Sequence, residues 1–180
     1  SLNVDYVIRL ASLGRIYYPL LEAETNSDTD TNRNGYLAVD KTVKSYWYDK
    51  LGLSETLPVI AVCWRGVGNK KQRNHTYQSV EEISSLLKGL NAQIVSVQYG
   101  ADQEELKVLK ASGVTIIEPR NVNLKDDLEA LSAIISNADL LISPATANFE
   151  IAGTLGVPTF VFGIEGQSWN LSSHYLNSFY

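Results

Sequence analysis

Short apolar runs alternate with helical patterns along most of this 180-residue chain, and this alternation limits the possible folds more than any other feature. Strands joined by helices and short loops form parallel sheets, because right-handed crossovers permit little else. We therefore predict an α/β domain with a doubly wound parallel sheet of about five to six strands, helices on both faces and strand order 3-2-1-4-5. The predicted strands are Val59–Trp64, Ile94–Val97, Val114–Ile117, Leu140–Ser143 and Thr159–Phe162.

The helices are predicted from capping residues and apolar spacing. Asp40 is expected to cap a helix that runs through Leu51 and stops at Gly52. Ser79 should cap a second helix, with Val80, Ile83, Leu86, Leu87 and Leu90 on one buried face. The remaining predictions are Asp102–Ala111, a helix capped near Asn123 that carries Leu124, Leu128, Leu131, Ile134 and Ile135, and Thr146–Leu155.

Composition excludes several classes of protein. The net charge of −5 argues against general binding of nucleic acid, which needs a basic face. The longest apolar run, Pro58–Trp64, is too short to span a bilayer, and no signal peptide is visible. The single cysteine, Cys63, is interpreted as a buried hydrophobe in a reducing compartment. The absence of methionine indicates an excised or processed piece.

The segment Ala138–Gly153 predicts an anion site. It reads as a buried strand, a tight turn of small residues and a helix that opens at Thr146. Free backbone N–H groups at a helix start beside the carboxyl end of a strand commonly bind phosphate. In the predicted strand order, this helix start lies next to the loop after the first strand.

That first loop is basic. No acidic residue occurs between Glu55 and Glu81, whereas Arg65, Lys70, Lys71 and Arg73 all lie there. The loop matches neither a Walker A motif nor a complete dinucleotide fingerprint. Gly66 would allow close backbone approach, and the cations could neutralise a diphosphate. A solvated basic loop is the alternative, and the residues alone leave both interpretations open.

Candidate catalytic groups are scarce. His75 and His174 have no metal-ligand neighbours, so we expect no metal site. Asp102 and Glu150 follow strand ends, where a carboxylate could accept hydrogen bonds from a ribose diol. Each could equally be a helix-start charge favoured by the helix dipole. Asp139 precedes its strand and is predicted to be structural.

Three segments resemble the C-terminal domain of GT-B glycosyltransferases: Val59–Gly66, Val95–Asp102 and Asn137–Pro158. The chain is similar in particular to the heptosyltransferase-like family 9 and to its relatives fused to tetratricopeptide repeats. The resemblance implies a Rossmann-like, nucleotide-sugar-binding domain at residues 39–180. Residues 1–38 would then be the end of an N-terminal domain and an interdomain connection with a polar loop.

The resemblance also implies roles for single residues. Arg73, with Arg65 or Lys70, would hold the donor diphosphate, and Asp102, after the turn that begins at Tyr99, would contact ribose. The helix start at Thr146 would receive the phosphates. The residues expected to bind the donor are Arg65, Gly66, Lys70, Arg73, Tyr99, Asp102, Thr146, Ala147, Asn148 and Glu150.

In this family the general base comes from the N-terminal domain, so no catalytic residue is assigned and the fragment is expected to bind donor without turnover. No metal or other cofactor is expected, because the protein supplies the positive charge. The implied partners are a nucleotide-sugar donor, a glycan, lipid-linked or protein acceptor and the N-terminal domain, with no nucleic acid and no transmembrane segment. A cytoplasmic enzyme of bacterial cell-surface glycan synthesis is expected, with peripheral inner-membrane association as a further option.

Two departures from the family pattern bear on function. Many relatives carry Asp where this chain has Ala145, and His where it has Glu150. The resemblance places that Asp on the transferred sugar in heptosyltransferases, so another donor sugar is open here. A binding or interaction module without turnover is the alternative function. A non-hydrolysing epimerase is a third, although the further acid and base residues it needs are not found.

Overall fold

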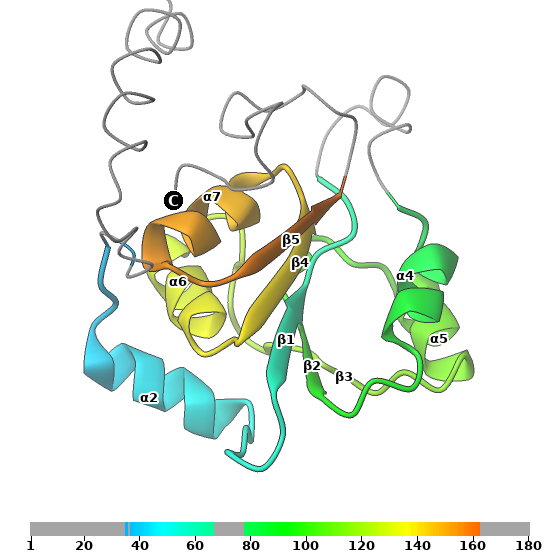
Figure 1. Cartoon of the computed structure of the whole chain (residues 1–180), viewed down its shortest axis with the longest axis horizontal. Coiled ribbons are helices and arrows are strands. Elements are labelled where there is room, and N and C mark those ends of the chain that lie inside the picture. Colours follow the sequence, from blue (N-terminus) through cyan, green and yellow to red (C-terminus); the bar gives the residue numbers. More distant parts are fainter. Residues whose placement is uncertain (1–34, 36, 67–77, 163–180) are drawn as a thin grey trace, which may run out of the picture.

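A computed structural model describes residue 35 and residues 37–66 and 78–162 of the chain. They form one five-stranded parallel sheet in the order β3-β2-β1-β4-β5 (Figure 1). This order and the predicted fold class are confirmed, with five strands in the described part of the chain. The strands are β1 Val59–Val62, β2 Gln93–Ser96, β3 Ile116–Ile117, β4 Leu140–Pro144 and β5 Thr159–Phe162.

Helices cover both faces of the sheet (Figure 1). Side chains of β1 alternate between the two layers because successive residues of a strand point to opposite faces. Val59, Ala61 and Cys63 pack with α2, α6 and α7, whereas Ile60, Val62 and Trp64 pack with α4 and α5. The helices are α2 Lys41–Lys50, α4 Val80–Leu87, α5 Gln103–Ala111, α6 Leu128–Ser136 and α7 Ala147–Leu155.

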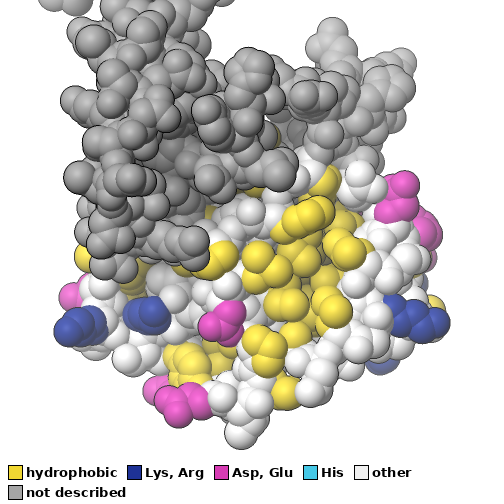
Figure 2. All heavy atoms as spheres, in the orientation of Figure 1, with side chains coloured by type: hydrophobic (Ala, Val, Ile, Leu, Met, Phe, Trp, Pro, Cys, Tyr) yellow, Lys and Arg dark blue, Asp and Glu magenta, His cyan; other side chains and the backbone are white. Residues whose placement is uncertain are grey.

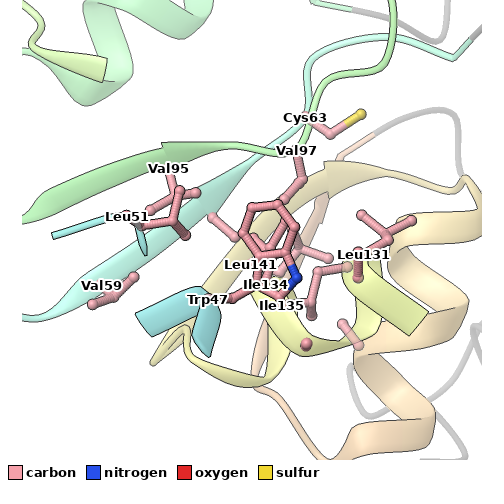
Figure 3. Close-up of a cluster of buried hydrophobic side chains, with 14 of the residues drawn as sticks. Trp47, Leu51, Val59, Cys63, Val95, Val97, Leu131, Ile134, Ile135 and Leu141 are labelled. Atoms are coloured by element: carbon pink, nitrogen blue, oxygen red, sulfur yellow. The ribbon is translucent and has the colours of Figure 1, made fainter. Parts of the chain in front are cut away.

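Trp47 of α2 fills the larger core. Its ring lies among side chains that include Leu141 of β4, Ile134 of α6 and Val97, which follows β2 (Figure 3). The Lys44 ammonium donates to the Ser136 carbonyl at 2.6 Å, which also places a cation at the C-terminus of α6. The helix before the first strand is therefore an integral layer of this domain.

The predicted caps Asp40 and Ser79 are confirmed, and Asp102 and Thr146, predicted as helix starts, also occupy N-cap positions. The side chains of Asp40, Ser79 and Asp102 accept hydrogen bonds from the first turns of α2, α4 and α5. Thr146 occupies the N-cap of α7, as expected, but its side chain makes no capping hydrogen bond. None of the described helices is long and apolar enough to cross a bilayer.

The predicted cap near Asn123 is wrong. The Asn123 carbonyl accepts from the N–H groups of Asp126 and Asp127, which closes a turn, and α6 begins only at Leu128 with Asp127 as its cap. Asx side chains favour turns as strongly as helix caps, and the turn prevails here. Leu128, the first residue of α6, is 56% exposed.

The buried face predicted for α4 is correct for Val80, Ile83 and Leu87 and wrong for two residues. Leu86 and Leu90 are 47% and 45% exposed. Leu90 lies beyond the helix, which ends at Leu87, and Leu86 lies on its flank. The third strand is also shorter than predicted, at two residues.

The chain enters the domain beside the end of α7. The Leu37 N–H donates to the Thr154 carbonyl at 2.9 Å, and a Cβ at Gly35 would collide with the backbone of Leu155 and Gly156. Only glycine fits at this close approach. The domain boundary predicted at residue 38 stays a prediction.

Candidate functional site

The carboxyl ends of β1 and β4 lie side by side at the point where the strand order reverses. Ile60 pairs with Leu140 and Val62 with Ile142, and the Cys63 N–H donates to the Ile142 carbonyl at 2.9 Å. The loop after β1 and the start of α7 therefore leave the sheet from one edge. In open α/β sheets, ligands bind at this switch point. Of the basic residues predicted here, Lys70 and Arg73 lie outside the described residues.

Gln98 holds the two loops at this edge together. Its buried side chain accepts from the N–H groups of Trp64 and Arg65, each at 2.9 Å. Its amide nitrogen donates to the carbonyls of Arg65 and Tyr99 at 2.9 and 2.8 Å. Since backbone groups buried without partners are costly, Gln98 allows the chain to leave β1 as an irregular loop.

Arg65 forms an ion pair with Glu105 of α5. Arg65 Nε lies 2.6 Å from Glu105 Oε1, and its Nη2 donates to Oε2 at 2.8 Å and to the Gly100 carbonyl at 2.7 Å. The hydrogen bond to Glu105 raises the pKa of Arg65. This predicted diphosphate ligand thus has its charge matched within the protein, and its contacts tie the β1 loop to the β2–α5 turn.

The Glu105 carboxylate accepts hydrogen bonds from three residues. Besides Arg65, it accepts from Trp64 Nε1 at 3.2 Å and from the Asp102 N–H at 2.9 Å. Burial raises the pKa of this carboxyl, but the hydrogen bonds from Arg65, Asp102 and Trp64 outweigh it and hold the pKa below its usual value. Glu105 therefore stays ionised at neutral pH as the centre of a rigid polar cluster.

Asp102, predicted to contact ribose, caps α5. Its Oδ1 accepts from the Glu105 N–H at 2.8 Å, while Glu105 reaches back to the Asp102 N–H. This reciprocal capping box is the helix-start role that the sequence left open. The carboxylate is exposed, and so is Tyr99, whose ring centroid lies 6.0 Å from the Lys125 ammonium.

The start of α7 differs from the other helix starts. Thr146 Oγ1 lies 3.2 Å from Ser143 Oγ instead of capping the helix. Asn148 Nδ2 donates to the Val97 carbonyl at 3.0 Å, which fixes the first turn of α7 against the end of β2. Ala145 and Ala147 are exposed and add no bulk around the turn. Glu150 is half-buried in the same first turn.

Cys63 lies beneath this helix start and is 3% exposed, as the sequence predicted for a small buried hydrophobe. Burial raises the pKa of its thiol, although hydrogen bonding with the Arg65 carbonyl and with Ser143, Asn148 and Thr146 acts in the opposite direction. A protonated, buried thiol is a poor nucleophile. Cys63 is therefore a packing residue of the switch point.

An open pocket of about 370 Å³ adjoins this cluster. The turn after β2, with Tyr99 and Gly100, forms one wall, and the segment after β3, with Glu118 and Asn123, forms another. Both walls follow carboxyl ends of strands, on the same edge of the sheet as the start of α7. Within the described residues, no group of three His, Cys, Asp or Glu side chains could hold a metal ion.

Comparison with solved structures identifies the fold. Glycosyl transferase family 9 from Veillonella parvula superposes with a TM-score of 0.55 at 19% identity, over 89% of this chain and 45% of that one. E. coli ADP-heptose lps heptosyltransferase II gives 0.52 at 17% identity, over 69% and 38%. The chain has a family 9 glycosyltransferase-like fold. The resemblance stated from the sequence is thus confirmed at the level of the fold.

Among curated sequences, Protein FlbA of Caulobacter vibrioides is 27% identical over 130 residues, which are 72% of this chain and 22% of FlbA. No protein-family model matches the chain. The chain spans less than half of both glycosyltransferase structures and about a fifth of FlbA.

Two residues of the cluster were missed by sequence reasoning, Gln98 and Glu105. Glu105 had a signal, because Asp102-x-x-Glu105 is a capping-box pattern. Gln98 is a single polar residue at the end of an apolar strand pattern. Its partners are backbone groups of a loop distant in sequence, and no local pattern indicates them.

Proposed function

We propose that this chain is the donor-binding half of a glycosyltransferase that moves a sugar from a nucleotide-sugar to a glycan, lipopolysaccharide or protein acceptor. Both structural neighbours named above are glycosyltransferases, and one is named for ADP-heptose. Fold likeness alone does not determine chemistry, so the proposal rests on the switch point.

The observation that carries the proposal is the start of α7. Each of the other described helices has an N-cap side chain that accepts a hydrogen bond from its first turn, whereas the Thr146 side chain caps nothing. This helix start lies beside the loop that begins at Cys63 and leads to Lys70 and Arg73. Backbone N–H groups and a helix dipole at such a position suit a diphosphate.

In the proposed reaction an acceptor hydroxyl attacks the anomeric carbon, and the bond from that carbon to the diphosphate oxygen breaks. Negative charge develops on the departing diphosphate, and fixed N–H groups and cations stabilise it. Thr146, Ala147 and Asn148 would provide the helix start, and Arg73 or Lys70 the cations. The N-terminal domain would supply the general base, and no metal is invoked.

The nucleoside would extend from the diphosphate toward the pocket between Tyr99 and Asn123. The Asp102 carboxylate is exposed, next in sequence to Ala101 of the pocket lining, and could accept hydrogen bonds from ribose hydroxyls with the oxygen that does not cap α5. Arg65 is better suited to hold the polar cluster around Glu105 than to bind the diphosphate, because Glu105 already binds its guanidinium. Gly66 directly follows Arg65 and precedes the basic segment that contains Lys70 and Arg73.

Calorimetric titration with ADP, GDP, UDP and CDP, without added metal, tests the proposal. We expect one nucleotide to bind saturably and Ala147→Asp to weaken it about tenfold, because a carboxylate at the first helical position repels the diphosphate. Gln103→Asp is the matched control: it places the same charge at the first position of α5, and should leave affinity unchanged. Arg73→Ala should also weaken binding.

A module that keeps the fold without turnover is the second candidate, and the Arg65–Glu105 pair favours it because it removes one cation from the site. Absence of binding across the panel, both in this chain and in the full-length protein, would support the module and contradict donor binding. Binding that Ala147→Asp leaves unchanged would place the nucleotide elsewhere on the molecule.

A further inference from the structure

The open pocket of about 370 Å³ between the turn after β2 and the segment after β3 combines polar and apolar lining residues. Its volume is in the range of small-molecule sites. It lies on the β2–β3 side of the sheet, away from the β5 edge, where Figure 2 shows mainly hydrophobic side chains. A few polar groups in an otherwise apolar pocket fix the orientation of a ligand and give specificity. The arrangement of these groups therefore indicates which ligand fits.

Ser96 is a buried hydrogen-bond donor at this pocket. Its side chain lines the pocket, and the residue is only 4% exposed. The Ser96 oxygen accepts from the Gln98 N–H at 3.3 Å, but the hydroxyl donates to no group of the protein within the described ranges. Buried polar groups normally have partners, and a hydroxyl can donate as well as accept. An acceptor on a ligand would complete the hydrogen bonding of Ser96.

Glu118 lies beside Ser96. The parallel strands β2 and β3 pair Ile94 with Ile116 and Val95 with Ile117. Continued by one residue, this register sets Ser96 next to Glu118, with both side chains on the same face of the sheet. Glu118 is exposed, lines the same pocket and has no hydrogen bond or ion pair to another described residue. The pocket thus presents a hydroxyl donor next to a carboxylate with two acceptor oxygens.

The other walls of the pocket suit a flat ring. Tyr99 is 36% exposed and lines the pocket together with Pro119 and Val122. Aromatic side chains bind nucleobases by stacking, which favours every base alike. Discrimination between bases must then come from hydrogen bonds to the edge of the ring, and Ser96 and Glu118 lie where such an edge would be read.

We propose that Ser96 and Glu118 select guanine, so that the donor is a guanosine diphosphate sugar. This inference rests on the proposed function, which supplies the nucleotide. The pairing edge of guanine carries the O6 acceptor, the N1–H donor and the N2 amino donor in that order. The Ser96 hydroxyl would donate to O6, and the two oxygens of Glu118 would accept from N1–H and from the N2 amino group, as a bidentate carboxylate can.

The other bases match less of this pattern. Adenine and cytosine each offer one amino donor beside a ring nitrogen that is itself an acceptor, so one carboxylate oxygen would face a lone pair. Uracil has its single N–H between two carbonyl oxygens, which leaves the same conflict. A site built for hydrogen bonds rejects ligands that leave its polar groups unpaired. The expected base therefore differs from that of the structural neighbour named for ADP-heptose.

Calorimetric titration of the 180-residue chain with GDP, ADP, UDP, CDP and inosine diphosphate tests the proposal. Inosine diphosphate lacks only the N2 amino group of GDP, so comparison of the two isolates one contact of Glu118. We expect GDP to bind about tenfold more tightly than inosine diphosphate and about a hundredfold more tightly than the other three. Glu118→Gln should weaken GDP about tenfold and reduce its advantage over inosine diphosphate to about twofold.

Two further variants make the test specific. Ser96→Ala should weaken GDP and inosine diphosphate alike, because both keep O6, and should leave their ratio unchanged. Glu55→Gln is the matched control for Glu118→Gln: it removes the same charge from an exposed residue that precedes β1, at the opposite edge of the sheet. All affinities should stay unchanged in this control.

The possible failures can be told apart. Tighter binding of ADP, UDP or CDP than of GDP would overturn the selection of guanine and leave donor binding in place. A preference for GDP that Glu118→Gln retains would also overturn the proposal, because the base would then be read elsewhere. Absence of binding across the panel, in this chain and in the full-length protein, would contradict donor binding and the selection of guanine with it.

Discussion

The helices α5 and α7 begin at the same edge of the sheet, but their N-termini differ in side-chain capping. The start of α5 is closed twice, by the Asp102 cap and by Glu105, which returns to the Asp102 N–H. The start of α7 has no side-chain cap, and its Thr146 hydroxyl pairs with Ser143. Both are nine-residue helices that follow buried strands, so their lengths do not explain the difference.

The comparison distinguishes two parts of this edge of the sheet. We call the hydrogen-bonded cluster of Gln98, Arg65 and Glu105 the frame, and the uncapped start of α7 at Thr146 the opening. Gln98, Arg65 and Glu105 use their hydrogen-bonding groups on one another and on the backbone, which fixes the two loops beside β1 and β2. A fixed frame next to an uncapped helix start would suit the diphosphate site proposed above. Substitutions in the frame should therefore affect folding most, whereas substitutions at the opening should affect binding.

The largest effect on stability is expected from Glu105→Ala. The substitution removes the partner of Arg65 and of Trp64 Nε1, and leaves a half-buried guanidinium without its carboxylate. We expect a loss of about 3 kcal/mol in the free energy of unfolding, measured in urea. Glu104→Ala is the control, because its ion pair with Lys107 is exposed and should contribute under about 0.5 kcal/mol.

The variant Arg65→Met with Glu105→Ala sharpens this prediction. It removes both charges, so it should recover part of the stability that Glu105→Ala loses. A double variant less stable than Glu105→Ala by the full cost of a second lost side chain would show that the two residues act independently. The frame would then not depend on their ion pair.

A smaller effect should distinguish the two helix caps directly. Asp102→Ala should lower the free energy of unfolding by about 1 kcal/mol, because it removes a capping hydrogen bond. Thr146→Ala should cost under about 0.5 kcal/mol, since no capping bond is lost. Equal losses in urea denaturation would mean that both helix starts are capped alike, and that α7 is not open to an anion.

The sequence predicted the fold well because fold class depends on periodic patterns. Five apolar runs separated by helical segments indicated a doubly wound sheet, whose usual strand order is the one observed, and Asp40 and Ser79 act as caps as predicted. The helix start at Thr146 was predicted from the same local reasoning. Each of these features depends on residues within a few positions of one another.

The sequence did not predict features that depend on distant contacts. The exposure of Leu86 depends on which flank of α4 meets the sheet, and the role of Gln98 depends on a loop 33 residues earlier. The position of Asn123 had two local solutions, a turn and a cap, and the chain adopts the turn, with Asp127 as the cap of α6. Lys70 and Arg73 lie outside the described residues, so their placement stays a prediction.

The smallest effect in this comparison is a dependence of stability on pH. The pKa of Glu105 in the folded protein lies below its ordinary value of 4.5, so its charge contributes stability that is complete above about pH 4.5 and is lost as the pH falls through the folded pKa. The wild-type protein should therefore lose its advantage over Glu105→Gln between about pH 4.5 and lower values. Urea midpoints of both proteins at pH 7, 5, 4 and 3 measure this.

Asp40 must be separated from this effect, because hydrogen bonds from the Val43 and Thr42 N–H groups lower its pKa as well. Asp40→Asn in both backgrounds removes that contribution and leaves the difference due to Glu105. The effect is small because a protonated Glu105 keeps part of its hydrogen bonding and loses only the attraction of its charge for Arg65. A difference between wild type and Glu105→Gln that stays constant from pH 7 to pH 3 would show that the charge of Glu105 adds nothing, and that the frame is held by neutral hydrogen bonds alone.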